Sequence, residues 1–108
     1  MIKPTMLPSL VAVALSLGAS VAAAQEVPTL DVAPLCRAQA KAAQDLGDAC
    51  LADEKRARDE LVRRWAEFAP ASRTRCTGMV KSIAGAQSYV ELLTCLQIAV
   101  DVKGLPKQ

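Results

Sequence analysis

The sequence contains no histidine and very few aromatic side chains: one tryptophan, one tyrosine and one phenylalanine among 108 residues. Without histidine there is no Ser–His or Cys–His nucleophile pair and no proton shuttle of the usual kind at neutral pH. The aromatic residues Trp65, Phe68 and Tyr89 lack interleaved basic residues, so they do not form a stacking platform for nucleic-acid bases. These absences argue against a catalytic protein and against a nucleic-acid-binding protein.

The number and distribution of charged residues do not indicate a nucleic acid, a membrane surface or another charged substrate. The chain has 13 Lys and Arg against 11 Asp and Glu, a net charge of +2, without a block of like charge. We therefore expect no nucleic-acid partner and no polybasic membrane-binding segment. The neighbouring carboxylates Asp53-Glu54 and Asp59-Glu60 point about 100° apart on a helix, which favours a solvated face over an acid–base pair. No glycine-rich phosphate loop is present, and we expect neither an enzyme nor a cofactor.

What is present begins with an export signal. Lys3 precedes an apolar run over residues 6–21 that has no ionisable side chain, and Ala22-Ala23-Ala24 follows it. A basic start, an apolar centre and an A-x-A exit are typical of a secretory signal peptide, here cleaved after Ala24. The alternative, an uncleaved anchor, needs about 20 apolar residues, and this run is shorter. We expect residues 1–24 to be removed, leaving a periplasmic or secreted protein without stable membrane insertion.

Four cysteines follow this signal: Cys36, Cys50, Cys76 and Cys95. An even number of cysteines in a short exported chain predicts two disulfides. The alternative is a metal site made of four thiolates. Structural zinc sites use closely spaced cysteine pairs, whereas the gaps here are 13, 25 and 18 residues. The same spacing excludes a C-x-x-C redox motif, so we expect structural disulfides and no bound metal.

Hydrophobic periodicity predicts an all-α fold, a small array of three to four helices held by two disulfides. The clearest helix spans residues 49–68, whose apolar side chains recur at helical spacing: Cys50, Ala57, Leu61, Trp65 and Phe68. This pattern places Trp65 and Phe68 in the core. Three acid-first pairs four residues apart predict a charged, solvated opposite face: Glu54–Arg58, Asp59–Arg63 and Glu60–Arg64.

Turn residues delimit the other helices. An alanine-rich helix over 35–46 is expected to end at Gly47, and the next begins with Asp48 as its N-cap. Ser72 is expected to cap a third helix that runs to residue 84. Ser88-Tyr89-Val90-Glu91 is a capping box that opens a fourth helix, which ends at Gly104.

Helix lengths rank the three possible disulfide connectivities. Measured along the helices from the turn at Pro70, Cys50 lies about 27 Å away and Cys76 about 6 Å away. Bridged α-carbons must approach within about 4.4–6.8 Å, so a Cys50–Cys76 bond is excluded, and with it Cys36–Cys95. If the last helix continues in the direction of the third, the ranking favours Cys36–Cys76 with Cys50–Cys95. The turn Gly85-Ala86-Gln87 could instead reverse the last helix.

The stretch from Cys50 to Gln97, with CLADEKRARDELVRRWAEF, SRTRC and SYVELLTCLQ, resembles small exported proteins of Gram-negative bacteria with no assigned function. The layout of cysteines and helices over residues 36–97 is also loosely similar to periplasmic lysozyme-inhibitor-like proteins, which are helical, disulfide-bonded and of about this size. The resemblance implies a helical exported domain held by disulfides, and it supplies no functional residue.

The predicted organisation is a signal peptide over 1–24, a flexible lead-in over 25–34, a disulfide-bonded helical domain over 35–104, and a tail over 105–108.

For function we expect a non-enzymatic periplasmic or secreted interaction protein, such as an inhibitor or an envelope-associated module, with another protein as its partner. The alternative is a carrier or chaperone-like binder of apolar ligands or unfolded proteins. That alternative rests on the last helix, which is apolar on more than one face through Leu92, Leu93, Leu96, Ile98 and Val100.

Overall fold

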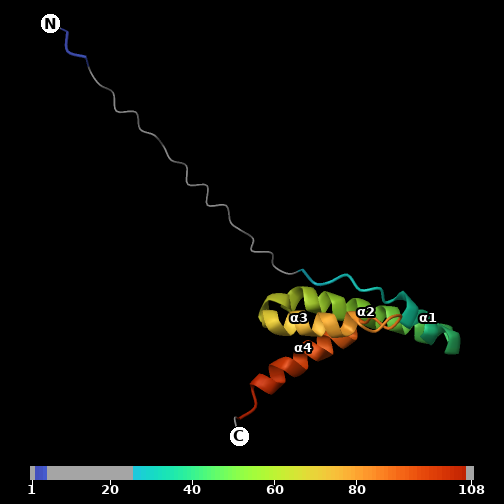
Figure 1. Cartoon of the computed structure of the whole chain (residues 1–108). Helices are drawn as coiled ribbons and strands as arrows, with labels where there is room; N and C mark the ends of the chain where they lie inside the picture. Colours follow the sequence, from blue (N-terminus) through green and yellow to red (C-terminus); the bar gives the residue numbers. More distant parts are fainter. Residues whose placement is uncertain (1, 5–25, 107–108) are drawn as a thin grey trace.

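The computed structural model describes residues 2–4 and 26–106. In this part of the chain it contains four α-helices, a short 3-10 helix and no strand, which confirms the predicted all-α fold (Figure 1). Apart from residues 2–4, the predicted signal peptide lies outside the described residues, as does its cleavage site.

The first two helices form a hairpin. α1 spans Ala33–Ala42 and α2 spans Gln44–Arg64, and only Ala43 separates them, in an extended conformation with φ −161° and ψ 138°. The helix break is therefore at Ala43, and the predicted break at Gly47 is wrong. Gly47 lies inside α2 and is buried, and a Cβ atom added there would lie 2.5 Å from the Ala40 Cβ atom. This glycine allows the two helices to approach closely beside their bend.

Replacing Gly47 by alanine is expected to lower the free energy of unfolding by about 1–3 kcal/mol, because the added methyl group overlaps Ala40 in a packed interface. The matched control is Gly78→Ala in α3 (Pro70–Lys81), where an added Cβ meets nothing within 4 Å. That change should raise stability by about 0.5–1 kcal/mol, since alanine is the better helix former. Urea denaturation measures both, and equal effects of the two substitutions would contradict the assigned role of Gly47.

The second half of the domain follows a sharp turn after α2. A 3-10 helix over Trp65–Glu67 continues α2, and α3 begins at Pro70 and not at the predicted cap Ser72, which is buried. Proline suits the first turn of a helix because its missing N–H would have no intrahelical partner there. Gly85 then takes φ 75°, and α4 spans Tyr89–Lys103.

The core lies where α2, α3 and α4 meet. Its most completely buried large side chains come from all three of these segments and from the turn after α2: Phe68, Leu61, Leu92, Leu96 and Cys76. Trp65 and Phe68 are buried as predicted. The last turns of α4 point away from the other helices (Figure 1) and expose Ile98 and Val102, and Leu105 just after the helix is exposed as well.

The segment before α1 is packed more tightly than a flexible lead-in. Leu30 is buried in the core cluster, and its backbone N–H donates to the Tyr89 hydroxyl over 2.9 Å. The Asp31 N–H donates to the Gln87 side chain over 3.0 Å, and the Asp31 carboxylate accepts from the Ala33 N–H at the start of α1. Residues 30–33 are thus fixed to the turn that precedes α4.

The structure contains the two predicted disulfides with a different pairing: Cys36–Cys50 and Cys76–Cys95, with Cα–Cα distances of 5.4 and 5.7 Å. The predicted pairs Cys36–Cys76 and Cys50–Cys95 are therefore wrong. Cys36 and Cys50 lie seven residues either side of Ala43, so the hairpin brings them level, each about 10 Å from the bend. The turn at Gly85 reverses α4 against α3, which brings Cys95 to Cys76.

Candidate functional site

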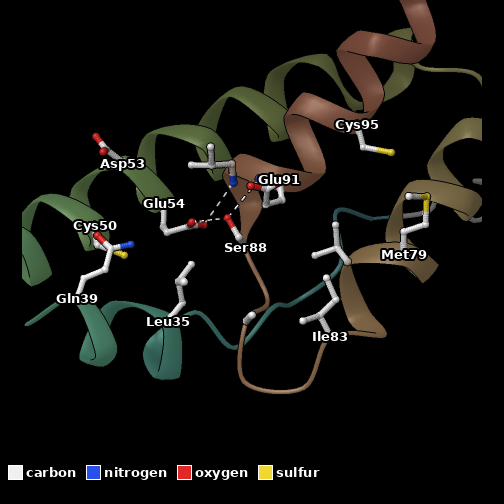
Figure 2. Close-up of a pocket in the computed structure, with 13 residues that line it drawn as sticks. Leu35, Gln39, Cys50, Asp53, Glu54, Met79, Ile83, Ser88, Glu91 and Cys95 are labelled. Atoms are coloured by element: carbon white, nitrogen blue, oxygen red, sulfur yellow. Dashed lines mark hydrogen bonds between the residues drawn. The ribbon is translucent and has the colours of Figure 1, made fainter. Parts of the chain in front are cut away.

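An open cleft of about 640 Å³ lies between the two disulfide-linked hairpins. Its lining residues come from all four helices and from the turn before α4: Leu35, Gln39, Cys50, Asp53, Glu54, Met79, Val80, Ile83, Ala86, Ser88, Val90, Glu91 and Cys95. Figure 2 shows Leu35 of α1 and Ile83 after α3 on opposite sides of the cleft, with Glu54 and Ser88 between them. Each disulfide contributes a cysteine to the lining.

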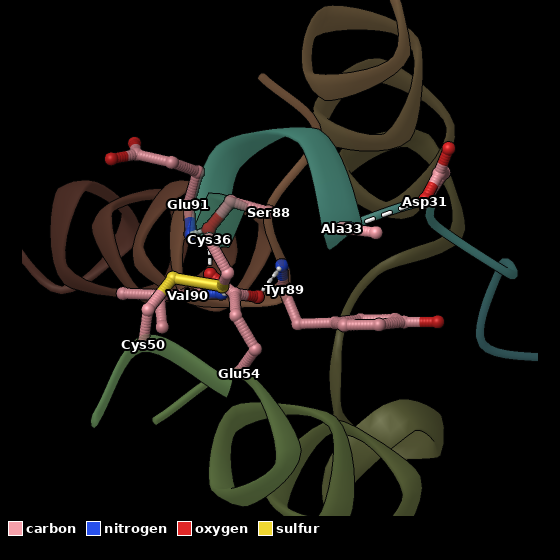
Figure 3. Close-up of a disulfide and its surroundings, with 9 residues drawn as sticks. All are labelled: Asp31, Ala33, Cys36, Cys50, Glu54, Ser88, Tyr89, Val90 and Glu91. Carbon is pink, nitrogen blue, oxygen red and sulfur yellow. Dashed lines mark hydrogen bonds between the residues drawn. A yellow bond between two sulfur atoms is a disulfide. The ribbon is translucent and has the colours of Figure 1, made fainter. Parts of the chain in front are cut away.

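Glu54 is the buried acid of this cleft, with 4% of its surface exposed. Its carboxylate accepts from the Ser88 hydroxyl over 2.5 Å, from the Tyr89 N–H over 2.5 Å and from the Val90 N–H over 3.4 Å. The Ser88 oxygen in turn accepts from the Glu91 N–H over 3.2 Å, and the Ser88 carbonyl accepts from the Leu92 N–H. The N–H groups of Tyr89, Val90 and Glu91, which have no partner in the backbone ladder of α4, are thereby satisfied by side chains (Figure 3).

The capping box is confirmed in one half only. Ser88 caps α4 as predicted, but among the described residues the Glu91 carboxylate makes no return bond to Ser88. Glu54, from a different helix, instead accepts from the Ser88 hydroxyl and from the N–H of the next residue, Tyr89. A negative charge at a helix N-terminus is favourable because the helix dipole is positive there, so this carboxylate fastens α4 to α2.

Sequence reasoning placed Glu54 on the solvated face, paired with Arg58, and that assignment is wrong. Glu54 belongs to the buried stripe of α2, four residues after Cys50 and three before Ala57. Its position as the single carboxylate within the apolar stripe of α2 is the sequence feature from which the burial of Glu54 could have been predicted. Because its oxygens are occupied by three donors at the start of α4, Glu54 acts as a structural acceptor.

The mouth of the cleft is apolar. Met79, Ile83 and Val90 line it and keep 58%, 56% and 39% of their surfaces exposed. By contrast, Leu92 and Leu96, which the sequence suggested as part of a groove along α4, are completely buried in the core. Ile98 and Val100 of the same predicted groove are exposed but lie outside the cleft, so the apolar surface of the cleft itself is at the junction of α3 and α4.

The charges on the cleft are all negative. Asp53 and Glu91 are the exposed carboxylates of the lining, and it includes neither lysine nor arginine. Asp53 forms an ion pair with Arg56 on the outer face of α2, while Glu91 has no ion-pair partner among the described residues. The cleft therefore combines an apolar mouth with an acidic rim.

The basic residues near the Pro70 turn do not form an open patch. The Arg64 guanidinium lies 5.0 Å from the centre of the Phe68 ring, and that of Arg73 lies 5.6 Å from the Trp65 ring. These cation–π contacts cover the buried aromatic side chains.

Elsewhere on α2 the charged side chains form ion pairs along the helix. Lys55 donates to Asp59 over 2.8 Å, and this hydrogen bond holds the pKa of Asp59 below its ordinary value.

The described residues, 2–4 and 26–106, contain no group of metal-ligating side chains that could hold an ion, and none of their helices is long and apolar enough to cross a membrane. Comparisons of the whole chain with protein-family models, with curated proteins and with solved structures give no match.

Proposed function

We propose that this protein is a non-enzymatic interaction module of an oxidising, exported compartment, and that its cleft binds an apolar segment of a partner protein. The observation that carries the proposal is the apolar mouth formed by Met79, Ile83 and Val90, which are large side chains left exposed beside a hollow. Exposed apolar side chains that lie together and are bordered by polar residues mark sites where proteins bind partners or ligands. The two disulfides support export, because such bonds persist in oxidising environments.

Two further features support binding without catalysis. Glu54, the buried acid of the cleft, is occupied by hydrogen bonds to α4, and the chain offers no histidine to act on a substrate. Two disulfide-linked hairpins also form the walls, so the cleft is held open before a partner arrives. Such preorganisation lowers the entropic cost of binding.

A cleft of about 640 Å³ is also large enough for a small ligand, since such pockets span about 300–1,000 Å³. The cleft volume therefore also fits a second candidate function, that of a carrier of small apolar molecules. The cleft is open to solvent along its mouth, and a carrier would need to enclose most of its ligand. Native mass spectrometry of the protein purified from its own compartment distinguishes the two, because a carrier would retain a ligand of discrete mass.

An aspartate in place of Ile83 is expected to remove the partner, because it puts a charge in the apolar mouth. Capture from a periplasmic extract with the oxidised protein should retain a specific protein, and Ile83→Asp should reduce its recovery about tenfold or more. Val102→Asp is the matched control, because Val102 is 59% exposed and Ile83 56%, but Val102 lies on the last turns of α4 outside the cleft. Equal recovery with both variants would contradict the proposal.

A further inference from the structure

We infer that the occupant of the cleft is a basic amphipathic segment, with apolar side chains that enter the mouth and with Lys or Arg residues beside them. This inference rests on the proposed function and names the chemistry of the partner. It is carried by charge complementarity between the cleft and its occupant.

The acidic character of the cleft is opposite to that of the whole chain. The chain has a net charge of +2, yet the cleft lining contains three carboxylates, Asp53, Glu54 and Glu91, and no cationic side chain. The basic side chains of the neighbouring helices, including Arg37 and Lys41 of α1 and Lys81 of α3, lie outside this lining. Carboxylates and exposed apolar side chains thus occur together in this cleft, without a cation in the lining.

The two exposed carboxylates lie on different helices that border the apolar mouth. Asp53 is on α2 and Glu91 is on α4, in the first turn after Val90. Arg56 neutralises part of the charge of Asp53, while Glu91 has no ion-pair partner among the described residues. Glu91 is therefore the carboxylate best placed to receive a cation from a bound segment.

The buried charge of Glu54 adds to this field. Glu54 is held by neutral donors and has no cationic side chain within ion-pair distance among the described residues. The N-terminus of α4 offsets about half a charge, so part of the negative charge is left. A charge surrounded by protein is screened less by salt than an exposed charge. The charge of Glu54 therefore attracts a cation bound at the rim through space, although the two groups are not in contact.

The apolar side chains of the mouth suit a segment of variable sequence. Met79 is unbranched and adapts its shape to what it contacts, and the branched side chains of Ile83 and Val90 add rigid apolar surface to the same mouth. Apolar anchors fix the position of a segment in such a groove, while charged neighbours decide which segments are accepted. An acidic segment with the same apolar residues would be repelled by the rim.

The test compares two labelled peptides that share one leucine stripe and carry either lysine or glutamate at every polar position. Fluorescence anisotropy with the oxidised protein should show that the lysine peptide binds about tenfold or more tightly than the glutamate peptide at low salt. Raising the salt concentration to about 0.3 M should narrow this difference. The double variant Asp53→Asn/Glu91→Gln should reduce it to about threefold or less. Asp101→Asn, an exposed carboxylate on α4 outside the cleft, should leave it unchanged.

The outcomes separate this inference from the proposed function. Equal affinity for both peptides, with both lost in Ile83→Asp, would overturn the charge preference and leave the cleft as the binding site. Absence of binding to the lysine peptide would also overturn the inference, whereas the proposed function fails only if Ile83→Asp keeps the captured partner. Self-association that Val102→Asp abolishes and Lys103→Glu leaves unchanged would overturn it as well, because the occupant would then be the apolar end of α4 from a second copy, bound without any contribution from its lysine.

Discussion

Replacing Glu54 by glutamine is expected to lower the free energy of unfolding by about 2–4 kcal/mol, one of the two largest effects of any substitution considered for this chain. The glutamine side chain has nearly the same shape, but only one of its two terminal atoms accepts hydrogen bonds. One of the groups that Glu54 satisfies, the Ser88 hydroxyl or the N–H groups of Tyr89 and Val90, would face an NH₂ group instead. A buried donor would then be left without a partner.

The matched control is Asp53→Asn, the neighbouring carboxylate on α2, which is exposed and pairs only with Arg56. Its effect should stay within about 0.5 kcal/mol. Urea denaturation followed by the fluorescence of Trp65, the single tryptophan of the chain and a buried residue, measures both changes. If Glu54→Gln were as stable as the control, the carboxylate would not be what fastens α4 to α2.

Removing the Cys76–Cys95 disulfide is expected to cost about 3 kcal/mol or more, and removing Cys36–Cys50 should affect mainly α1. The sequence separations of 14 and 19 residues predict similar losses of about 3 kcal/mol from chain entropy alone. The difference arises from packing. Cys76 belongs to the core cluster with Leu92 and Leu96, whereas Cys36 is the only buried residue of α1.

Cys36→Ala/Cys50→Ala should therefore release α1 and leave α2, α3 and α4 to unfold cooperatively. Hydrogen exchange would show early loss of protection over residues 33–42, and binding to the cleft should weaken, because Leu35 and Gln39 of α1 form one wall. Cys76→Ala/Cys95→Ala should lower the stability of the whole domain. Greater global destabilisation from the Cys36–Cys50 variant would contradict this order.

Tryptic mapping of the oxidised protein checks the pairing itself. Cleavage sites lie between the two cysteines of each pair, at Arg37 between Cys36 and Cys50, and at Lys81 between Cys76 and Cys95. Linked fragments should therefore join Cys36 to Cys50 and Cys76 to Cys95. A fragment linking Cys36 to Cys76 would contradict the structure.

The sequence by itself determined the all-α class of this fold, the buried stripe of its longest helix and the start of α4. The apolar stripe of α2 predicted a helix with Trp65 and Phe68 in the core, because a 3.6-residue period leaves one face to be buried. Ser88 predicted the start of α4, because a serine hydroxyl accepts from the N–H three residues on, and this bond is present. These are local properties, in which the interacting groups lie within a few residues of each other.

Only the tertiary structure decided how these elements pair. Both the pairing of the disulfides and the direction of α4 depend on single backbone conformations, at Ala43 and at Gly85, because a few degrees of freedom in a turn redirect a whole helix. For the same reason, the roles of Glu54 and Gly47 could not be predicted from the sequence. Periodicity tells which face of a helix is buried, but not which residue packs against that face. For Glu54 the neighbour is the N-terminus of α4, 35 residues away, and for Gly47 it is Ala40, which the bend at Ala43 brings back against α2.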